Sequence, residues 1–406
     1  MQITQEQREL LNSIDDCREL MLSRTKEVCS INSGSYNRSG LMETCDWFHS
    51  LFSPIIPSVS QVDLAPIREV DTRGNSTSYI TSPCLVFEHN PKADFQIICT
   101  GHYDTVFPAH SSFKNVWEDG DKLRGPGVAD MKGGLVVLWQ TLKVFLSSRW
   151  SDQCGITVIL SPDEEIGSPS SAAILAKYAQ RANVGLTYEP AYEDGTFAGA
   201  RKGSGNFQVV LRGVAAHAGR AFFEGKNALI AASKLAVMLS ELSDEDTGVT
   251  INVGCIDGGG PVNVVPETAV VRFNVRVFEE SQMAPIIQSI DNCMAQVNSE
   301  TGCEVERFGS FNRPPKPMDK RQQPLFELLK DVGQALGQQV HWVPTGGCCE
   351  GNNLAAAGLP VVDTLGVRGA NIHSDQEYAI IESFVERAKL STMLLWTLCE
   401  RKGVLC

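Results

Sequence analysis

The sequence lacks the features of a membrane protein and of a nucleic-acid-binding protein. No stretch approaches the ~18 consecutive apolar residues that cross a bilayer. The first residues are polar and lack the basic-then-apolar pattern of a signal peptide. Lysine and arginine form no clusters, and the formal net charge is −13, whereas nucleic acids and anionic membranes select basic surfaces. We therefore expect no nucleic-acid partner, no membrane association and a cytoplasmic protein.

The thirteen cysteines form neither a CxxC pair nor a regular disulfide framework, and their number is odd. This pattern favours free thiols, mostly buried, in a reducing compartment. The vicinal pair Cys348–Cys349 fits either a soft-metal site or the packing of a loop, and we favour packing. Internal repeats and low-complexity segments are also absent. With 43% apolar and 20% charged residues, the composition is that of an ordinary globular protein.

Apolar strands alternate with helical segments along the first half of the chain. Apolar residues at helical spacing begin at residues 6–31. The segments that follow are a strand at 94–101, a helix at 131–148, a strand at 155–161, a helix at 170–182 and a strand at 184–189. This alternation predicts an α/β fold in which helices sandwich a mostly parallel sheet. Functional residues in such sheets lie just past the carboxyl ends of strands.

The pattern changes at about residue 203. Between residues 203 and 312 the order is strand, helix, two strands, helix and strand, which predicts a ferredoxin-like α+β domain. The proline-rich "NRPPKP" that follows is typical of a linker, and the alternation of strands and helices then resumes. We therefore expect one larger domain, formed by residues 1–202 and 313–406, with a domain of residues 203–312 inserted into it.

Histidine and acidic residues recur at the ends of the predicted strands. His102 and Asp104 are two residues apart, so in an extended chain their side chains point to the same face. The further candidates, each at a strand end or in a loop, are Asp130, the pair Glu164–Glu165, Glu189 and His373. Imidazole and carboxylate groups both bind zinc, and two ions close together need a carboxylate that bridges them. These positions therefore predict a centre for two divalent metal ions.

The residues also divide into roles within such a centre. Asp130, in a glycine-rich turn, suits the bridge between the ions, and Asp104 would accept the other N–H of His102 and fix its orientation. If one glutamate of "DEE" binds metal, its neighbour projects elsewhere and can act as a general base toward water. Each signal alone has a structural alternative such as a helix cap, but five of them at strand ends favour a common site.

Six segments of the chain resemble motifs of one family, in the order that the family has them. They are "GHYDTVFP", "GPGVADMKGG", "SPDEEIGS", "YEP", "GVAAHAGRAFFEGKNA" and "GANIHSDQEY". The family is that of the dizinc peptidases and deacylases, which includes glutamate carboxypeptidases, acetylornithine deacetylases and succinyl-diaminopimelate desuccinylases. The resemblance covers almost the whole chain, and "GARKGSGNF" is most similar to the glutamate carboxypeptidase branch.

The resemblance implies a role for each candidate. His102, Asp130 and Glu189 would bind one Zn²⁺, and Asp130, Glu165 and His373 the other, with Co²⁺ or Mn²⁺ as alternatives to zinc. Glu164 would be the general base and Asp104 the residue that orients His102. The resemblance also implies a cis peptide bond after Asp130.

In the inserted domain, the resemblance implies a lid that also forms a homodimer. His217 would reach the active site of the partner subunit and stabilise the oxyanion of the reaction. Asn263 and Arg276, together with the loop of Gly346 and Gly347, would hold the substrate and its carboxylate. The chain departs from the family at Glu350, where an aspartate is common, and at Tyr103, where leucine or methionine is frequent.

The predicted function is that of a zinc-dependent hydrolase of an amide bond. Its substrate would be an N-acyl amino acid or a short peptide with a free carboxylate, and a carboxypeptidase that releases glutamate is the first choice. The alternative enzyme is an N-acyl amino acid deacylase of the acetylornithine deacetylase or aminoacylase kind. A metal-binding scaffold without activity is disfavoured, because "DEE" retains the base.

Overall fold

The computed structural model describes residues 1–402. Its central sheet has six strands in the order β1-β4-β8-β5-β9-β16. Strands β8, β5, β9 and β16 are parallel, and β4 is antiparallel to both β8 and β1. The strands are β1 (Val59–Val62), β4 (Cys84–His89), β5 (Gln96–His102), β8 (Gly155–Ser161), β9 (Val184–Thr187) and β16 (Val361–Val362). The expectation of a mostly parallel sheet is confirmed.

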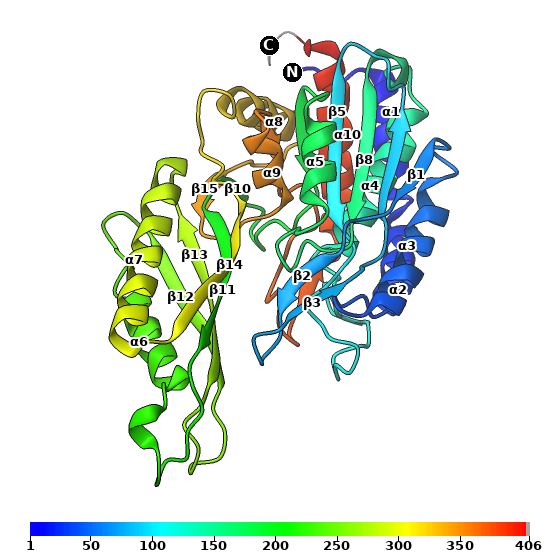
Figure 1. The fold of residues 1–406 in the computed structure, drawn as a ribbon. Helices are drawn as coiled ribbons and strands as arrows, with labels where there is room; N and C mark the ends of the chain where they lie inside the picture. Colours follow the sequence, from blue (N-terminus) through cyan, green and yellow to red (C-terminus); the bar gives the residue numbers. More distant parts are fainter. Residues whose placement is uncertain (403–406) are drawn as a thin grey trace.

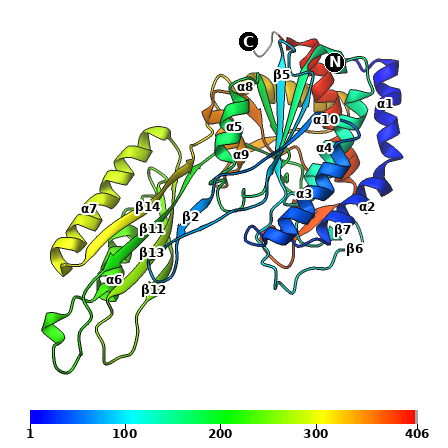
Figure 2. The same cartoon turned by 45° about the vertical axis from the view of Figure 1, so that its right-hand side comes forward.

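Helices cover both faces of this sheet (Figures 1 and 2). One face carries α1 (Gln5–Asp15), α2 (Arg18–Cys29), α3 (Arg38–Phe52), α4 (Lys132–Leu146) and α10 (Ser383–Glu400); the other carries α5 (Ala172–Ala179) and α9 (Glu350–Ala356), and α8 (Gln323–Ala335) lies beside α10. Helix α4 is buried around almost its whole circumference, as its nearly continuous apolar sequence requires. The helical segment at residues 6–31 is divided into two helices at Asp16 and Cys17.

The inserted region forms a separate antiparallel sheet in the order β12-β13-β11-β14. Its strands are β11 (Gly203–Arg212), β12 (Thr250–Gly258), β13 (Thr268–Val277) and β14 (Glu304–Arg313). Helices α6 (Ala228–Ser240) and α7 (Met283–Thr301) cover one face and enclose a second hydrophobic core (Figure 2). The ferredoxin-like order of elements is therefore present, and the opposite face of the sheet is left uncovered by helices.

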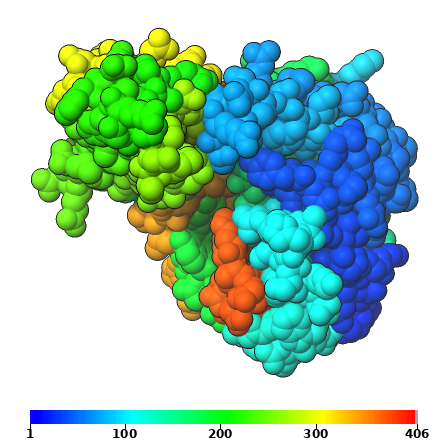
Figure 3. Space-filling view, turned by 60° about the horizontal axis from the view of Figure 1, so that its bottom comes forward, coloured from blue at the N-terminus to red at the C-terminus, as the bar shows by residue number. Residues whose placement is uncertain are grey.

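A hairpin of the larger unit contacts this open face. Strands β2 (Ile67–Val70) and β3 (Ser76–Tyr79) form the hairpin, and Val70 packs against Val210 and Val270 of the inserted sheet. The side chain of Gln208 accepts a hydrogen bond from the backbone of Val70 at 2.9 Å. Figure 3 shows the blue hairpin region abutting the green inserted sheet, so the two units touch away from their covalent connections.

Smaller elements complete the larger unit. Strands β10 (Phe197–Arg201) and β15 (Trp342–Thr345) pair beside the inserted sheet, and a second small sheet holds β6 (Trp117–Asp119), β7 (Lys122–Arg124), β17 (Gly369–Ala370) and β18 (Tyr378–Ile380). No helix within residues 1–402 is long and apolar enough to span a bilayer. The cysteines in this part of the chain are free, and most of them are buried.

Candidate metal and active site

His102 is the last residue of β5, and its side chain is completely buried. Its Nδ1 atom lies 3.0 Å from the backbone oxygen of Asp104 and 3.3 Å from that residue's carboxylate. These contacts fix the plane of the imidazole and turn Nε2 toward the acidic residues on the neighbouring strand ends. Asp104 therefore makes the contacts with His102 that its predicted orienting role requires.

Asp130 lies between the two histidines. Its Oδ1 atom is 3.2 Å from Nε2 of His102, and its Oδ2 atom is 3.2 Å from Nε2 of His373. The same His373 nitrogen is 3.2 Å from the carboxylate of Glu165. The peptide bond between Asp130 and Met131 is cis. One carboxylate thus faces two imidazoles with separate oxygens, which is the arrangement of a bridging ligand.

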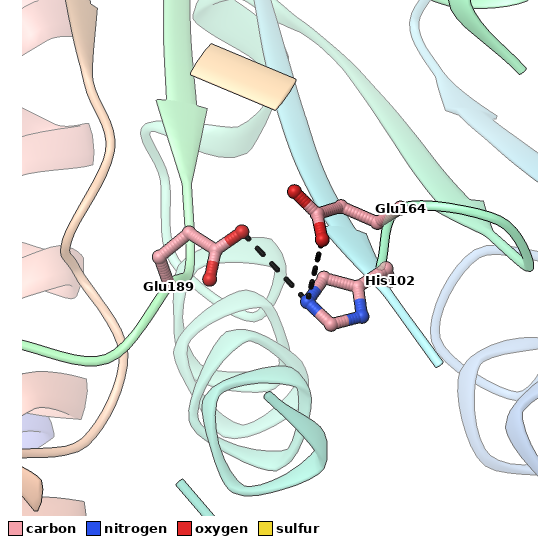
Figure 4. Close-up of side chains that lie close together, drawn as sticks. All are labelled: His102, Glu164 and Glu189. Atoms are coloured by element: carbon pink, nitrogen blue, oxygen red, sulfur yellow. Dashed lines mark ion pairs between the residues drawn. The ribbon is translucent and has the colours of Figure 1, made fainter. Parts of the chain in front are cut away.

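Glu164 and Glu189 approach His102 from two other strand ends. Glu164 follows β8 and Glu189 follows β9, and a carboxylate oxygen of each lies 3.8 Å from Nε2 of His102 (Figure 4). The ligand atoms of these three residues are close enough together to hold one ion, as are those of His102, Asp130 and Glu165. Glu164, the predicted base, therefore lies as near to His102 as the predicted ligand Glu189 does.

The charges in this cluster perturb the pKa values of its members. Burial and the neighbouring Asp130 raise the pKa of Glu165 to about 8 and move the pKa of Glu189 well above its usual range. Hydrogen bonds with Asp130 and Glu165 raise the pKa of His373 to about 11. Burial lowers the pKa of His102, but the acidic neighbours, led by Glu164, more than compensate and raise it. Four carboxylates lie close together in this cluster. Positive charge bound among them would therefore stabilise their ionised forms.

The residues present fit a pair of divalent cations. The donor set consists of carboxylate oxygens and imidazole nitrogens, which are zinc ligands. The Oε1 atom of Glu189 is buried and has no hydrogen-bond partner within residues 1–402, so it is free to bind an ion. A cation would also remove the repulsion among the carboxylates, which burial otherwise makes costly.

Backbone amides and two further residues support the acidic cluster. The carboxylate of Asp104 accepts hydrogen bonds from the backbone N–H groups of Glu164 and Glu165, each at 3.1 Å. Glu377 accepts from the backbone N–H groups of Gly127, Ala129 and Asp130 and so holds the turn that carries Asp130. The sequence reasoning passed over Glu377, although it lies inside the motif "GANIHSDQEY".

Arg313 is a second residue that the sequence reasoning passed over. Its guanidinium forms an ion pair with the carboxylate of Glu164, donates to the backbone oxygen of Glu164 at 2.7 Å and donates to Ser168 at 3.1 Å. Only 3% of the residue is exposed. The last residue of β14 thereby fixes both the side chain and the backbone of the predicted base.

The cluster opens into a cavity of about 910 Å³ that both units line. Arg276 reaches this cavity from β13, and its guanidinium donates to the backbone oxygen of Gly346 at 2.7 Å and to the side chain of Asn274 at 3.1 Å. Gly347 also lines the cavity. The structure therefore brings Arg276 and Gly347 to the cavity that contains the acidic cluster, with Gly346 in contact with Arg276.

His217 and Asn263 are not among the residues that line this cavity. Both lie in loops of the inserted region, where the backbone N–H of Ala218 donates to the oxygen of Asn263 at 2.9 Å and His217 pairs with Val264 in an isolated bridge. The structure thus places them beside each other and away from the cluster of their own chain. The role that the resemblance implies for His217 requires a second subunit.

The loop that departs from the family pattern contributes residues to the lining of the cavity and ends at Glu350. Glu350 is completely buried; one of its carboxylate oxygens accepts from Ser161, and the other has no hydrogen-bond partner within residues 1–402. Burial raises the pKa of Glu350 to about 7. Cys349 is buried and its sulfur accepts from the backbone N–H of Gly351 at 3.3 Å, and both Cys348 and Cys349 line the cavity. Cys349 therefore caps the helix α9.

Proteins of known sequence resemble this chain over most of its length. Carboxypeptidase G2 from a Pseudomonas species is 28% identical over 80% of each chain. A succinyl-diaminopimelate desuccinylase from Nitrosospira multiformis is 23% identical over 75% of this chain and 84% of its own.

Solved structures share the fold. The di-peptidase Dug1p from Saccharomyces cerevisiae matches 97% of this chain and 98% of its own with a TM-score of 0.75 at 16% identity. An M20 family metallo-carboxypeptidase from Sulfolobus solfataricus matches 94% of this chain and 99% of its own with a TM-score of 0.72, also at 16% identity. Residues 98–397 match the pattern of "Peptidase family M20/M25/M40". The chain therefore belongs to peptidase family M20/M25/M40 and is a hydrolase of amide or peptide bonds.

Proposed function

We propose that this enzyme is a metallo-carboxypeptidase that cleaves the amide bond next to an amino acid with a free α-carboxylate. A glutamate carboxypeptidase-like activity is the specific proposal. The observation that carries it is the position of Arg276, which lines the same cavity as the acidic cluster. A guanidinium binds a carboxylate with two parallel hydrogen bonds, so Arg276 would anchor the carboxylate end of the substrate. Similarity to carboxypeptidase G2 supports the same choice.

The proposed cofactor is a pair of Zn²⁺ ions, for which Co²⁺ or Mn²⁺ can substitute. One ion would be held by His102, Asp130 and Glu189, and the other by Asp130, Glu165 and His373. The two contacts of Asp130 with separate histidines support its role as the shared ligand. Bound ions would supply Lewis-acid chemistry, polarising the scissile carbonyl and making water more acidic.

The protein groups would divide the proton transfers and the positioning. Glu164 would accept the proton of the attacking water and return it to the departing amine. Arg313 holds this carboxylate in place, and Asp104 fixes both His102 and the backbone of Glu164. Arg276 would hold the substrate carboxylate, with Gly346 positioning the guanidinium.

The domain assignment and the homodimer are part of this proposal. Residues 1–202 and 313–406 would form the catalytic domain, and residues 203–312 the lid and dimer surface. Apolar side chains are exposed near His217: Phe223 is 97% exposed and Val262 is 102% exposed. Their burial against a second copy would be favourable and would deliver His217 and Asn263 to the partner's site. The free thiols also support a reducing, cytoplasmic compartment.

A substrate panel tests the proposed activity. The zinc-loaded protein is given acyl-glutamates and dipeptides that end in glutamate, together with acetylornithine and acetylated apolar amino acids, with and without a chelator. Chelator-sensitive release of glutamate is the expected result. Light scattering is expected to give a dimer, and a monomer near the chain mass of 44.2 kDa would contradict the role of His217.

A second candidate is an N-acyl amino acid deacylase. Similarity to a succinyl-diaminopimelate desuccinylase supports it, and it would use the same metal centre. Turnover of acetylated amino acids without release of glutamate from peptides would favour this candidate over the carboxypeptidase.

A further inference from the structure

The open face of the inserted sheet carries two rows of polar residues. Strand register places Asn252, Asn274 and Asn206 side by side on β12, β13 and β11. The neighbouring row consists of Thr250, Arg276, Ser204 and Arg313. All of these residues line the cavity that contains the acidic cluster, and so does Asn312 of β14. The wall opposite the predicted metal centre is therefore rich in carboxamide groups.

A chain of hydrogen bonds fixes the orientation of these carboxamides. The Nε–H of Arg276 donates to Oδ1 of Asn274 at 3.1 Å, so the Nδ2 group of Asn274 must point the other way. That Nδ2 group donates to Oδ1 of Asn206 at 2.7 Å and to the backbone oxygen of Gly205 at 3.2 Å. The Oδ1 atom of Asn206 thus accepts a hydrogen bond within the sheet. The Nδ2 group of this cavity-lining residue remains as a donor.

Two donors of this wall lie beside the loop that follows the predicted base. A Cβ atom added at Gly167 would lie 3.1 Å from Nδ2 of Asn312 and 3.5 Å from Nδ2 of Asn206. Within residues 1–402 neither Nδ2 group donates a hydrogen bond to the protein. Two N–H donors that make no hydrogen bond within residues 1–402 therefore lie near each other, beside the loop that contains Gly167.

The arginines that line the cavity already have partners or an assigned role. The two Nδ2 groups are therefore the main donors for a second polar group of the substrate. Arg313 is paired with Glu164, and Arg201 is paired with Asp363 at 2.7 Å. Arg276 is the cation assigned to the α-carboxylate. Asn206 is two residues beyond the cross-strand neighbour of Arg276, and such diagonal positions are ~7–8 Å apart. A short amino-acid side chain spans a comparable distance.

We propose that Asn206 and Asn312 form a specificity subsite for an oxygen acceptor on the side chain of the released amino acid. The inference rests on the proposed carboxypeptidase function, because Arg276 must hold the α-carboxylate for the side chain to reach the two donors. The acceptor is either the carboxylate of a glutamate side chain or the carboxamide oxygen of a glutamine side chain. An apolar side chain of the same length would leave both donors unpaired in the closed complex.

The test compares three substrates that differ in this one group: N-benzoyl derivatives of glutamate, glutamine and methionine. For the zinc-loaded enzyme we expect kcat/KM for glutamate and for glutamine to exceed that for methionine by about tenfold or more, the effect of two hydrogen bonds. The double variant Asn206→Leu/Asn312→Leu is expected to lose this advantage, so that kcat/KM becomes similar for the three substrates. Equal rates on all three substrates with the wild type would overturn the subsite.

Further variants separate the two acceptors and control for folding. Asn206→Asp replaces a donor by a negative charge, so it is expected to lower kcat/KM for glutamate several-fold more than for glutamine. Asn292→Leu, which changes an exposed asparagine of α7, is the matched control and is expected to leave all three rates unchanged. Loss of all three rates to the same extent in the double variant, with metal content and circular dichroism intact, would also refute the subsite.

The same measurements distinguish failure of the proposed function from failure of the subsite. If the loaded enzyme hydrolyses none of the three substrates but cleaves acetylornithine, the carboxypeptidase assignment is wrong, and the subsite falls with it. If it hydrolyses all three equally in a chelator-sensitive way and also releases glutamate from dipeptides that end in glutamate, the carboxypeptidase stands and the subsite alone is wrong.

Discussion

Replacing Glu350 by glutamine should change how the stability of the metal-free protein depends on pH. Glu350 is completely buried, and burial raises the pKa of its carboxyl from 4.5 to about 7. Between these two values the folded protein keeps a proton that the unfolded chain has released. The free energy of unfolding therefore decreases as the pH rises through this window.

The magnitude follows from the size of the shift. One pKa unit corresponds to about 1.4 kcal/mol, so ionisation of Glu350 should cost the folded state roughly 3 kcal/mol above pH 7. Glutamine cannot ionise and removes this term. It does place an amide nitrogen where a carboxylate oxygen has no hydrogen-bond partner within residues 1–402, which is unfavourable by about 1–3 kcal/mol at every pH. The informative quantity is therefore the change in relative stability with pH.

The assay is thermal unfolding of chelator-treated protein, followed by circular dichroism at pH 5 and pH 8. Relative to the wild type, Tm of Glu350→Gln should rise by about 3–4 °C between the two pH values. Glu306→Gln, which changes an exposed glutamate of β14, serves as the matched control and should show no such trend. A relative Tm that is the same at both pH values would show that Glu350 ionises in the folded protein as it does in the unfolded chain. Burial would then not raise the pKa of this carboxyl.

Three further predictions concern the site and its support. Glu164→Gln should lower kcat by at least about 100-fold while the metal content stays near two ions per chain; activity above a few per cent of the wild type would contradict its role as base. Arg276→Lys should raise KM for a carboxylate-bearing substrate by about tenfold or more with a smaller change in kcat, and an unchanged KM would exclude it as the anchor. Asp363→Ala should destabilise the protein by about 3–5 kcal/mol, because the buried Arg201 and Lys316 would lose their shared counter-charge; an unchanged Tm would refute this.

The sequence predicts the parallel strands of the central sheet and a cluster of candidate ligands at their ends, for a physical reason. Candidate ligands follow β5, β8 and β9, and the carboxyl ends of parallel strands meet at one edge of the sheet. Their convergence therefore follows once the strands are recognised. The sequence does not predict β1, β2 and β3, because four residues of mixed polarity carry no clear alternation. It also does not predict β4, whose short apolar run cannot be assigned to a strand by periodicity alone. Their pairing depends on tertiary contacts.

The sequence pattern does not identify residues whose role depends on partners far away in the chain. Glu377 binds backbone groups about 250 positions earlier in the chain, and nothing near it in the sequence specifies those partners. The row of Asn206, Asn252 and Asn274 also could not be predicted. These residues become neighbours only when the strands pair in their observed register. A polar residue in a strand is usually a solvated one, so each asparagine alone gave no signal.

The contact between Arg313 and Glu164 could not be predicted from the local sequence around Arg313. The segment "NRPPKP" was interpreted as a linker, and the residue before a proline does favour extended backbone. In the structure β14 continues to Arg313, so the side chain is directed into the larger unit rather than into solvent. There it pairs with Glu164, which comes from a strand end 149 positions earlier. Any rotation of the inserted domain about this junction would therefore alter the contact that holds the proposed base.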